Sequence, residues 1–245
     1  MRADAFLAAA EALPFAGLDE LAAGRGILVV APHPDDESLG CGGLIAEACA
    51  RGLPVRVIIV SDGSGSHPNS PSYPSERLRT VRERETLEAA RVLGLASEHV
   101  SFLRLPDRFV PSSGPEAEAV AEIIAAMATV CGARMLLATW VHDPHCDHAA
   151  ASAIARLARG RLPHLRVMEY PVWGWALPAE TEVGGAPQGV RLDIGRRLEA
   201  KCAAVAAHRS QTTALIDDDP TGFRLDAEML ARFARPFEIY LDVVG

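Results

Sequence analysis

The sequence predicts an α/β fold in which helices cover both faces of a mostly parallel central sheet. The first observation is a series of short runs of β-branched and other apolar residues along the first 170 residues. Segments with apolar residues at helical spacing separate these runs, and strands that alternate with helices form βαβ units with parallel strands. No internal repeat and no sharp shift in composition marks a second domain, so a single domain is expected.

The alternating part supplies five expected strands and four expected helices. The strands are the runs at 27–31, 55–60, 101–105, 134–139 and 165–170. The helices are the segments at 38–51, 75–93, 115–131 and 147–159. In parallel sheets, ligands bind at the carboxyl ends of the strands, so polar residues that follow these strands are candidates for a functional site.

The remaining segments are expected to be loops and a C-terminal elaboration. Segment 62–76 is rich in Gly, Ser and Pro and is expected to be a loop that overhangs the same sheet edge. After residue 170 the pattern predicts irregular structure at 172–189, a helix at 196–208 and a final strand at 236–243. The expected domain covers residues 1–245, with a core at about 25–170 and the elaboration at 171–245.

Composition and charge exclude several classes of partner. With 24 Lys and Arg against 32 Asp and Glu, the chain has a net charge of −8 and lacks the clustered cations that nucleic acids or anionic membranes require. The five cysteines form no C-x-x-C pair, which is typical of reduced thiols in the cytoplasm. The N-terminus does not resemble a signal peptide, and segment 117–141 carries too many charges to span a membrane. A cytoplasmic protein is therefore expected.

A polar cluster follows the first expected strand, in the sequence VVAPHPDDESLGCGG at 29–43. Pro34 favours an extended backbone at His33, and the chain then turns into a helix, so that His33 and Asp36 can converge on one point. An imidazole and a carboxylate at a strand end form half of a zinc site, and the following glycines allow the helix to pack closely. Alternatively, the carboxylates only cap the helix and interact with its macrodipole.

A second polar cluster, HDPHCDH at 142–148, follows the fourth expected strand. His145 and His148 are three residues apart at the start of a helix, so both rings can lie on one face. Alternatively, this segment is a solvated loop in which Asp147 caps the helix. Two such clusters at one sheet edge favour a common site.

Together the two clusters could form one catalytic zinc site. A catalytic zinc takes about three protein ligands and leaves one position open. The three ligands would be His33, Asp36 and His148. Asp35 is then free to act as a general base and His145 to transfer a proton. Asp147 or Asp143 would be near enough to orient the ring of His145.

The sequence resembles the PIG-L/LmbE family of zinc-dependent N-deacetylases in four motifs. The first hallmark, (A/P)HPDD(E/D), is present as PHPDDE at 32–37, and the second, D-x-H-x-D-H, is present at 143–148. The third, R-x-x-E-x-x-x-A-x-x-x-L-G, fits residues 82–94. The fourth, K-x-x-A-x-x-x-H-x-S-Q, fits residues 201–211. The motifs occur in order over most of the chain.

The resemblance implies a Rossmann-like fold and a role for each site residue. One zinc ion per chain, or another divalent ion in its place, would be held by His33, Asp36 and His148. Asp35 would be the general base, and His145 the acid or the oxyanion stabiliser, tuned by Asp147. Arg82 would lie near the acyl end of the substrate. Whether His145 or Asp35 protonates the leaving amine stays open.

The resemblance also implies the reaction, which is the removal of an N-acetyl group from an amino sugar or a related small conjugate. The alternatives are an amidase acting on a thiol–sugar conjugate and a metal-dependent phosphoesterase, which would need ligands for two metals. The expected partner is thus a small N-acetylated molecule, with no nucleic acid and no membrane, and a homo-oligomer stays an open alternative.

Four further side chains lie outside these assignments. Trp173 and Trp175 suit either stacking on a sugar ring or packing in the core or a subunit interface. His208 is expected to be structural or to support the site from behind. His67, in the Pro- and Ser-rich loop, is expected to be exposed to solvent.

Overall fold

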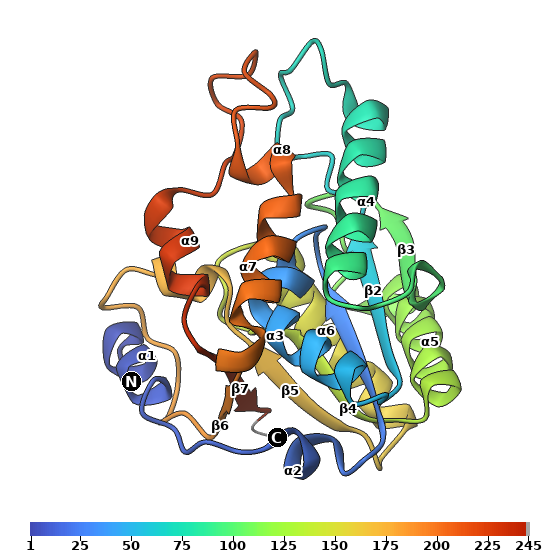
Figure 1. Ribbon diagram of the computed structural model, residues 1–245, viewed down its shortest axis with the longest axis vertical. Helices are drawn as coiled ribbons and strands as arrows, with labels where there is room; N and C mark the ends of the chain where they lie inside the picture. Colours follow the sequence, from blue (N-terminus) through green and yellow to red (C-terminus); the bar gives the residue numbers. More distant parts are fainter. Residues whose placement is uncertain (244–245) are drawn as a thin grey trace.

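The apolar runs form a seven-stranded sheet in the computed structural model, which describes residues 1–243 (Figure 1). The strands are β1 (Gly26–Ala31), β2 (Val55–Ser61), β3 (Val100–Leu105), β4 (Ala133–Thr139), β5 (Arg166–Tyr170), β6 (Gly189–Asp193) and β7 (Phe237–Asp242). Their order in the sheet is β3-β2-β1-β4-β5-β7-β6. Strands β1 to β5 are parallel, as predicted, and β7 runs antiparallel to both of its neighbours.

Helices cover both faces of the sheet, because the central strands bury side chains on both sides. The main helices are α3 (Asp36–Ala50), α4 (Ser75–Val92), α5 (Gly114–Cys131), α6 (Cys146–Arg161) and α7 (Leu198–Ala207). Ile27 and Val29 of β1 pack towards α3, α4 and α7, whereas Leu28 and Val30 pack towards α5 and α6. Burial of each such aliphatic side chain contributes about 1.5–3 kcal/mol relative to exposure.

The shorter helices and one edge strand were not anticipated by the sequence patterns. The shorter helices are α1 (Ala3–Ala10), α2 (Leu18–Ala22), α8 (Arg209–Thr212) and α9 (Ala227–Phe233). Strand β6 is short and mostly half-buried, so it lacks the continuous apolar run that identifies the central strands.

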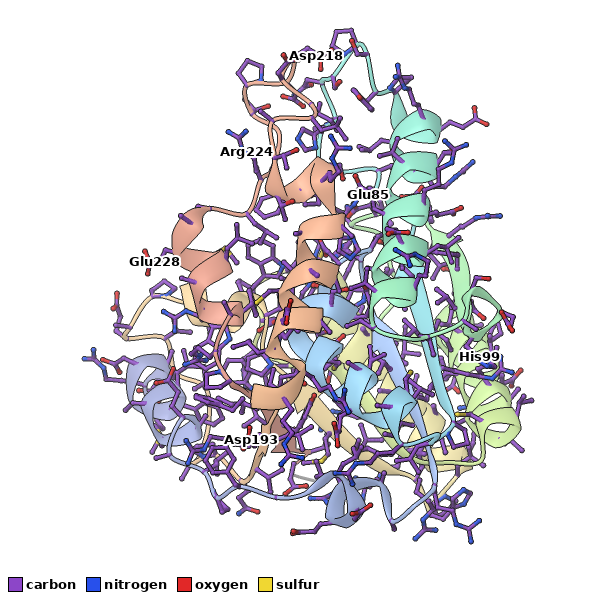
Figure 2. All side chains as sticks on the ribbon, in the orientation of Figure 1. Glu85, His99, Asp193, Asp218, Arg224 and Glu228 are labelled. Atoms are coloured by element: carbon purple, nitrogen blue, oxygen red, sulfur yellow. The ribbon has the colours of Figure 1, made fainter. Side chains whose placement is uncertain are left out.

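Exposed charged residues such as Asp193 and Glu228 lie at the periphery (Figure 2). Within residues 1–243, no helix combines the length and apolarity needed to cross a membrane.

The connections around β1 and β4 position the polar clusters. These two strands pair in parallel, yet the chain proceeds from β1 towards β2 and from β4 towards β5, in opposite directions across the sheet. Such a reversal opens a crevice at the carboxyl ends of the two strands, where α/β proteins bind ligands. Helix α3 begins five residues after β1 and α6 seven residues after β4, so both clusters enter this crevice.

Candidate active site

The turn from β1 into α3 holds His33 and Asp36 at one point. Pro32 extends the pairing with β2, because its carbonyl accepts a hydrogen bond from Ser61 N at 2.8 Å. The side chain of Asp36 folds back so that Oδ2 accepts a hydrogen bond from His33 N at 3.0 Å. The predicted close packing of the following helix is also present, since a Cβ at Gly40 would lie 2.1 Å from the ring of Tyr170.

The three predicted metal ligands come together at the start of α3 and α6. Asp36 Oδ2 lies 3.3 Å from His33 Nδ1 and 3.2 Å from His148 Nε2, and the two nitrogens are 3.3 Å apart. Zinc bonds of 2.0–2.1 Å in tetrahedral geometry require ligand atoms about 3.3–3.4 Å from one another. The spacing of the three donor atoms therefore matches that of three ligands around a zinc ion.

The charges of this cluster indicate what a cation would replace. Burial opposes the charged imidazolium, but hydrogen bonds with Asp107, Asp147 and Asp36 raise the pKa of His33 well above its usual value. Burial has the same effect on His148, and Asp36 and Asp143 nevertheless raise its pKa to about 9. The imidazolium charges in turn hold the pKa of the buried Asp36 far below normal. Without metal, the rings of His33 and His148 are therefore protonated, and a bound cation would displace these protons.

In both His33 and His148, the ring nitrogen that faces away from Asp36 contacts another carboxylate. Asp143 accepts a hydrogen bond from His148 Nδ1 at 2.9 Å, which turns Nε2 towards Asp36. Asp147 Oδ2 contacts His33 Nε2 at 3.2 Å and accepts a hydrogen bond from Arg108 N, while Oδ1 accepts one from Val110 N. This arrangement sets the orientation and basicity of metal-binding imidazoles in proteins.

The partners of Asp143 and Asp147 differ from the sequence-based expectation that one of them orients His145. Instead, the backbone N–H of Asp147 donates to Nδ1 of His145 at 3.3 Å, and the carboxylate of Asp147 affects His145 only through its charge. The sequence spacing places Asp147 near both histidines but does not determine which ring its carboxylate faces.

His145 is the N-cap residue of α6 and lies edge-on to His33, with 4.5 Å between ring centroids. Partial burial and the charges on His33 and His148 lower the pKa of His145 to about 4. The ring is therefore neutral near pH 7. Because Nδ1 accepts a hydrogen bond, the ring proton resides on Nε2, which is available as a donor.

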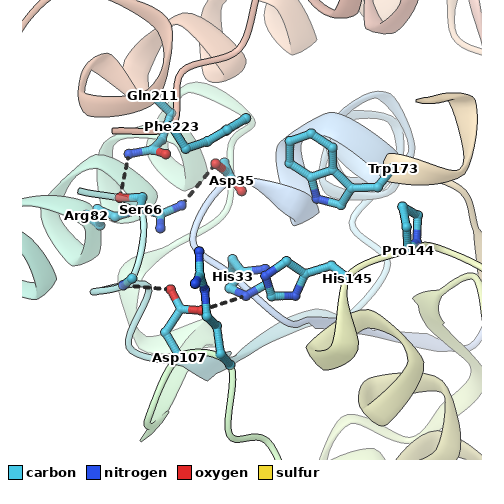
Figure 3. Close-up of a pocket in the computed structure, with 12 residues that line it drawn as sticks. His33, Asp35, Ser66, Arg82, Asp107, Pro144, His145, Trp173, Gln211 and Phe223 are labelled. Carbon is cyan, nitrogen blue, oxygen red and sulfur yellow. Dashed lines mark hydrogen bonds and ion pairs between the residues drawn. The ribbon is translucent and has the colours of Figure 1, made fainter. Parts of the chain in front are cut away.

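Asp35 lies next to the ligand cluster but points to the open cavity (Figure 3). Its Oδ2 accepts a hydrogen bond from Arg82 Nη2 at 3.0 Å, and both side chains are nearly fully buried. Burial raises the pKa of Asp35 to about 6, although the Arg82 charge opposes this shift. A carboxylate with this pKa can take up and return a proton near neutral pH.

Arg82, which was expected near the acyl end of a substrate, lines this cavity. Its guanidinium also binds the protein itself, because Nη2 donates to the Pro34 carbonyl at 2.6 Å and Nη1 to the Gly63 carbonyl at 2.7 Å. The residue therefore holds Asp35 and its turn, whatever else it contacts.

The cavity has a volume of about 320 Å³ and combines polar and aromatic walls. Its lining residues are His33, Asp35, Gly65, Ser66, Arg82, Asp107, Arg108, Pro144, His145, Trp173, Gln211 and Phe223. Trp173 packs edge-to-face on Phe223 with 4.9 Å between centroids and forms one wall (Figure 3). Trp175 instead is partly buried and packs against the core beneath the guanidinium groups of Arg232 and Arg235. The two tryptophans thus take different places.

Two features of this region were not predicted correctly or were missed. His67 is 5% exposed rather than solvated, because the segment around Gly222 covers it so closely that a Cβ there would lie 2.2 Å from the ring. Asp107 lines the cavity, lies 3.4 Å from His33 Nε2 and accepts a hydrogen bond from Gly65 N. Its position two residues after β3, at the same sheet edge, is the signal that could have identified it.

Two other groups within residues 1–243 could also hold a metal ion, and both share His33 with the predicted set of His33, Asp36 and His148. One consists of His33, His145 and His148, and the other of His33, Asp107, His145 and Asp147. Since His33 Nδ1 faces Asp36 and His148, a second ion beside Asp107 would have to share the same imidazole through Nε2. This geometry favours one metal ion per chain over the two metal ions that a metal-dependent phosphoesterase would need.

These features define a class, namely α/β proteins with a cluster of His and Asp side chains that could hold a metal ion at the carboxyl edge of a parallel sheet. Within this class, the chain belongs to the PIG-L family. The family model described as "PIG-L: GlcNAc-PI de-N-acetylase" matches residues 28–159, which is more than half of the chain and contains both polar clusters. The predicted family and the predicted fold are both confirmed.

Two curated relatives and one solved structure are similar over most of the chain. A Bacillus cereus protein named probable N-acetyl-alpha-D-glucosaminyl L-malate deacetylase 2 is 28% identical over 203 residues, which cover 79% of this chain and 87% of the relative. The 1D-myo-inositol 2-acetamido-2-deoxy-alpha-D-glucopyranoside deacetylase of Saccharomonospora viridis is 29% identical over 230 residues, which cover 76% and 85%. A conserved protein of Thermus thermophilus superposes with a TM-score of 0.64 at 26% identity and 89% and 94% coverage. The chain is accordingly an N-deacetylase, a hydrolase of amide C–N bonds.

Proposed function

We propose that the protein removes the N-acetyl group from a small N-acetylglucosamine-containing conjugate, with zinc held by His33, Asp36 and His148 and Asp35 as the general base. The observation that carries this proposal is the spacing of the donor atoms of these three residues, which lie 3.2–3.3 Å apart. The buried Asp35 carboxylate lies beside them and is not one of the three ligands. A closed structural site would have no use for such a spare acid–base group.

Zinc would supply Lewis acidity, which polarises an amide carbonyl and lowers the pKa of water from 15.7 to about 7. Asp35 accepts the proton of the attacking water, since its pKa of about 6 leaves it mostly ionised at neutral pH. Arg82 keeps Oδ2 of Asp35 in a fixed position for this transfer.

His145 donates a hydrogen bond from Nε2 to the oxygen on which negative charge develops. A neutral ring is sufficient for this role, because a fixed donor stabilises an oxyanion without giving up its proton. Asp35, which took up a proton in the preceding step, is placed to return it to the leaving amine.

The cavity suits a sugar ring attached to a second group. Its volume of about 320 Å³ is at the lower end of the range for small-molecule sites. Trp173 and Phe223 offer an apolar wall, and the Asp107 carboxylate and the Ser66 hydroxyl line the same cavity and can bind sugar hydroxyl groups. Both curated relatives carry the names of deacetylases for N-acetylglucosamine joined to malate or inositol, which supports this substrate class.

The test is a deacetylation assay with zinc-reconstituted protein and a panel of substrates. N-acetylglucosamine linked to malate, to inositol and to a second sugar would be compared with N-acetylated amines without a sugar and with a phosphate monoester, with acetate and phosphate as readouts. Acetate from the sugar conjugates alone supports the proposal. Phosphate release, or acetate only from amines without a sugar, contradicts it.

A further inference from the structure

The backbone of Asp35 has a conformation that side chains rarely adopt. Its φ of 134° and ψ of −29° lie outside the regions that are sterically allowed for residues with a Cβ. Such strain persists only where the surrounding structure enforces it, and it is frequent at functional sites.

The strained Pro34–Asp35 peptide is held at both of its polar atoms. The Pro34 carbonyl accepts a hydrogen bond from Arg82 Nη2 at 2.6 Å, and Asp35 N donates to Glu37 Oε2 at 3.0 Å. Arg82 and Glu37 are each 3% exposed, so neither hydrogen bond competes with bulk water. The plane of this peptide, and hence the direction of the Asp35 side chain, is fixed from two opposite sides.

Glu37 is itself held by a residue from the distant C-terminal part of the chain. Its second oxygen, Oε1, accepts hydrogen bonds from Ser38 Oγ at 2.7 Å and from His208 Nε2 at 3.1 Å. His208 is 1% exposed and lies at the junction of α7 and α8. A buried imidazole that binds the far side of the carboxylate prevents it from turning away from Asp35 N.

The same C-terminal segment is also connected to the helix that carries Arg82. Ser210 donates from its backbone N and its hydroxyl to the two oxygens of Glu85, at 2.8 and 2.6 Å. Glu85 lies one turn after Arg82 on α4, where α4 approaches α8 (Figure 2). The two sequence motifs at 82–94 and 201–211 therefore meet behind Asp35 and connect its two supports.

We propose that Glu37 and His208 are positioning residues, which keep the strained Pro34–Asp35 peptide in place so that the Asp35 carboxylate stays directed into the cavity. This inference rests on the proposed function in that Asp35 is the general base. Neither Glu37 nor His208 lines the cavity. Their loss should therefore affect the chemical step rather than substrate binding.

The experiment compares Glu37→Met, which removes the acceptor for Asp35 N, with Glu37→Gln, which retains it. The matched control is Glu238→Met. Glu238 is also a 3% exposed carboxylate that binds α3, because it accepts hydrogen bonds from Gly43 N and Leu44 N at 2.8 Å each and from Lys201 Nζ at 2.7 Å. It lies away from the Asp35 turn. Zinc content, melting temperature, kcat and KM would be measured for each variant.

Glu37→Met should lower kcat about 100-fold, as displacements of about 1 Å do in active sites, with KM and zinc content unchanged. Glu37→Gln should restore most of the kcat lost in Glu37→Met, whereas Glu238→Met should lower only the melting temperature. Wild-type kcat in Glu37→Met, or a Glu37→Gln variant as slow as Glu37→Met, would overturn the inference. If Glu37→Met does not fold, His208→Met replaces it, and wild-type kcat in that variant is equally decisive against the inference.

A crystal structure of the same variant provides a readout that does not depend on activity. The φ of Asp35 should leave the positive region in Glu37→Met, and an unchanged Asp35 would contradict the inference. If the wild-type protein releases acetate from no substrate, the proposed function fails, while the conformation of Asp35 in the variant still decides the role of Glu37.

Discussion

Asp143 and His148 form a fully buried pair in which the carboxylate accepts a hydrogen bond from Nδ1 at 2.9 Å. The same carboxylate accepts hydrogen bonds from the backbone N–H groups of Val172, Trp173 and Gly174, in the segment after β5. One side chain thus orients the ring of His148, a proposed metal ligand, and anchors the segment that carries the aromatic wall of the cavity.

Asp143→Asn should weaken zinc binding about 10–100-fold, because loss of the carboxylate partner of a metal-binding histidine typically has this effect. An amide also cannot accept from the imidazole and from three backbone N–H groups at once. Affinity would be measured by competition with a chelator. Asp193→Asn is the control, since within residues 1–243 the exposed Asp193 carboxylate accepts only a local hydrogen bond from Gly195 N. Equal zinc affinities in the two variants would contradict this role of Asp143.

Asp35→Asn should retain zinc and lose turnover, since the amide cannot accept the proton of water. A positioned general base contributes about 10²–10⁴-fold to the rate, so kcat should fall within this range. Zinc content and kcat would be measured on the same preparation. Wild-type rates in a zinc-loaded Asp35→Asn protein would exclude Asp35 as the base.

Zinc binding should release protons at neutral pH. In the metal-free protein, the pKa of His33 is raised and that of His148 is about 9, so both rings carry protons at pH 7 that zinc must displace. Apparent zinc affinity should therefore increase as the pH rises from 7 towards about 9 and decrease at lower pH. Calorimetric titrations in buffers with different ionisation enthalpies count the released protons. An affinity that does not change over this interval would show that the two rings are already neutral.

The sequence predicted the central sheet and the convergence of His33, Asp36 and His148 because both depend on local patterns. Apolar runs identify β1 to β5, and the polar residues directly after β1 and β4 are brought together by the topology of a parallel sheet. The sequence patterns did not predict strand β6, because a half-buried edge strand has no continuous run of apolar residues. Its pairing with β7 depends on contacts about 50 residues away in the chain.

The parts of the site that were not predicted depend on contacts between distant segments. Asp107 reaches His33 only because β3 ends at the same edge as β1, and no nearby motif marks it. Asp147 faces His33 rather than His145 because the backbone at Arg108 and Val110 supplies hydrogen bonds to its carboxylate. His67 is buried by a segment more than 150 residues away. The spacing of residues in the sequence does not determine which distant segments these side chains contact.

The rim of the cavity is formed by two loops that are far apart in sequence and connected by aspartate side chains. Asp218 accepts hydrogen bonds from Ser70 Oγ at 2.5 Å and from Ser72 N at 2.9 Å. The loop with Ser70 and the loop with Asp218 lie side by side beyond the N-terminal end of α4 (Figures 1 and 2). Below this contact, Phe223 N donates to Ser66 O at 2.7 Å, and both residues line the cavity.

Asp218→Ala should therefore raise KM for the sugar substrate and leave kcat nearly unchanged, because it loosens two lining residues without touching Asp35 or the ligands. The matched control is Asp217→Ala, which removes an exposed neighbouring carboxylate with no hydrogen bond or ion pair in the described part of the chain. Steady-state kinetics of both variants would be measured on the same substrate. A fall in kcat with constant KM in Asp218→Ala would place the effect on the catalytic groups instead. Equal KM values for the two variants would show that the contact between the loops does not shape the substrate site.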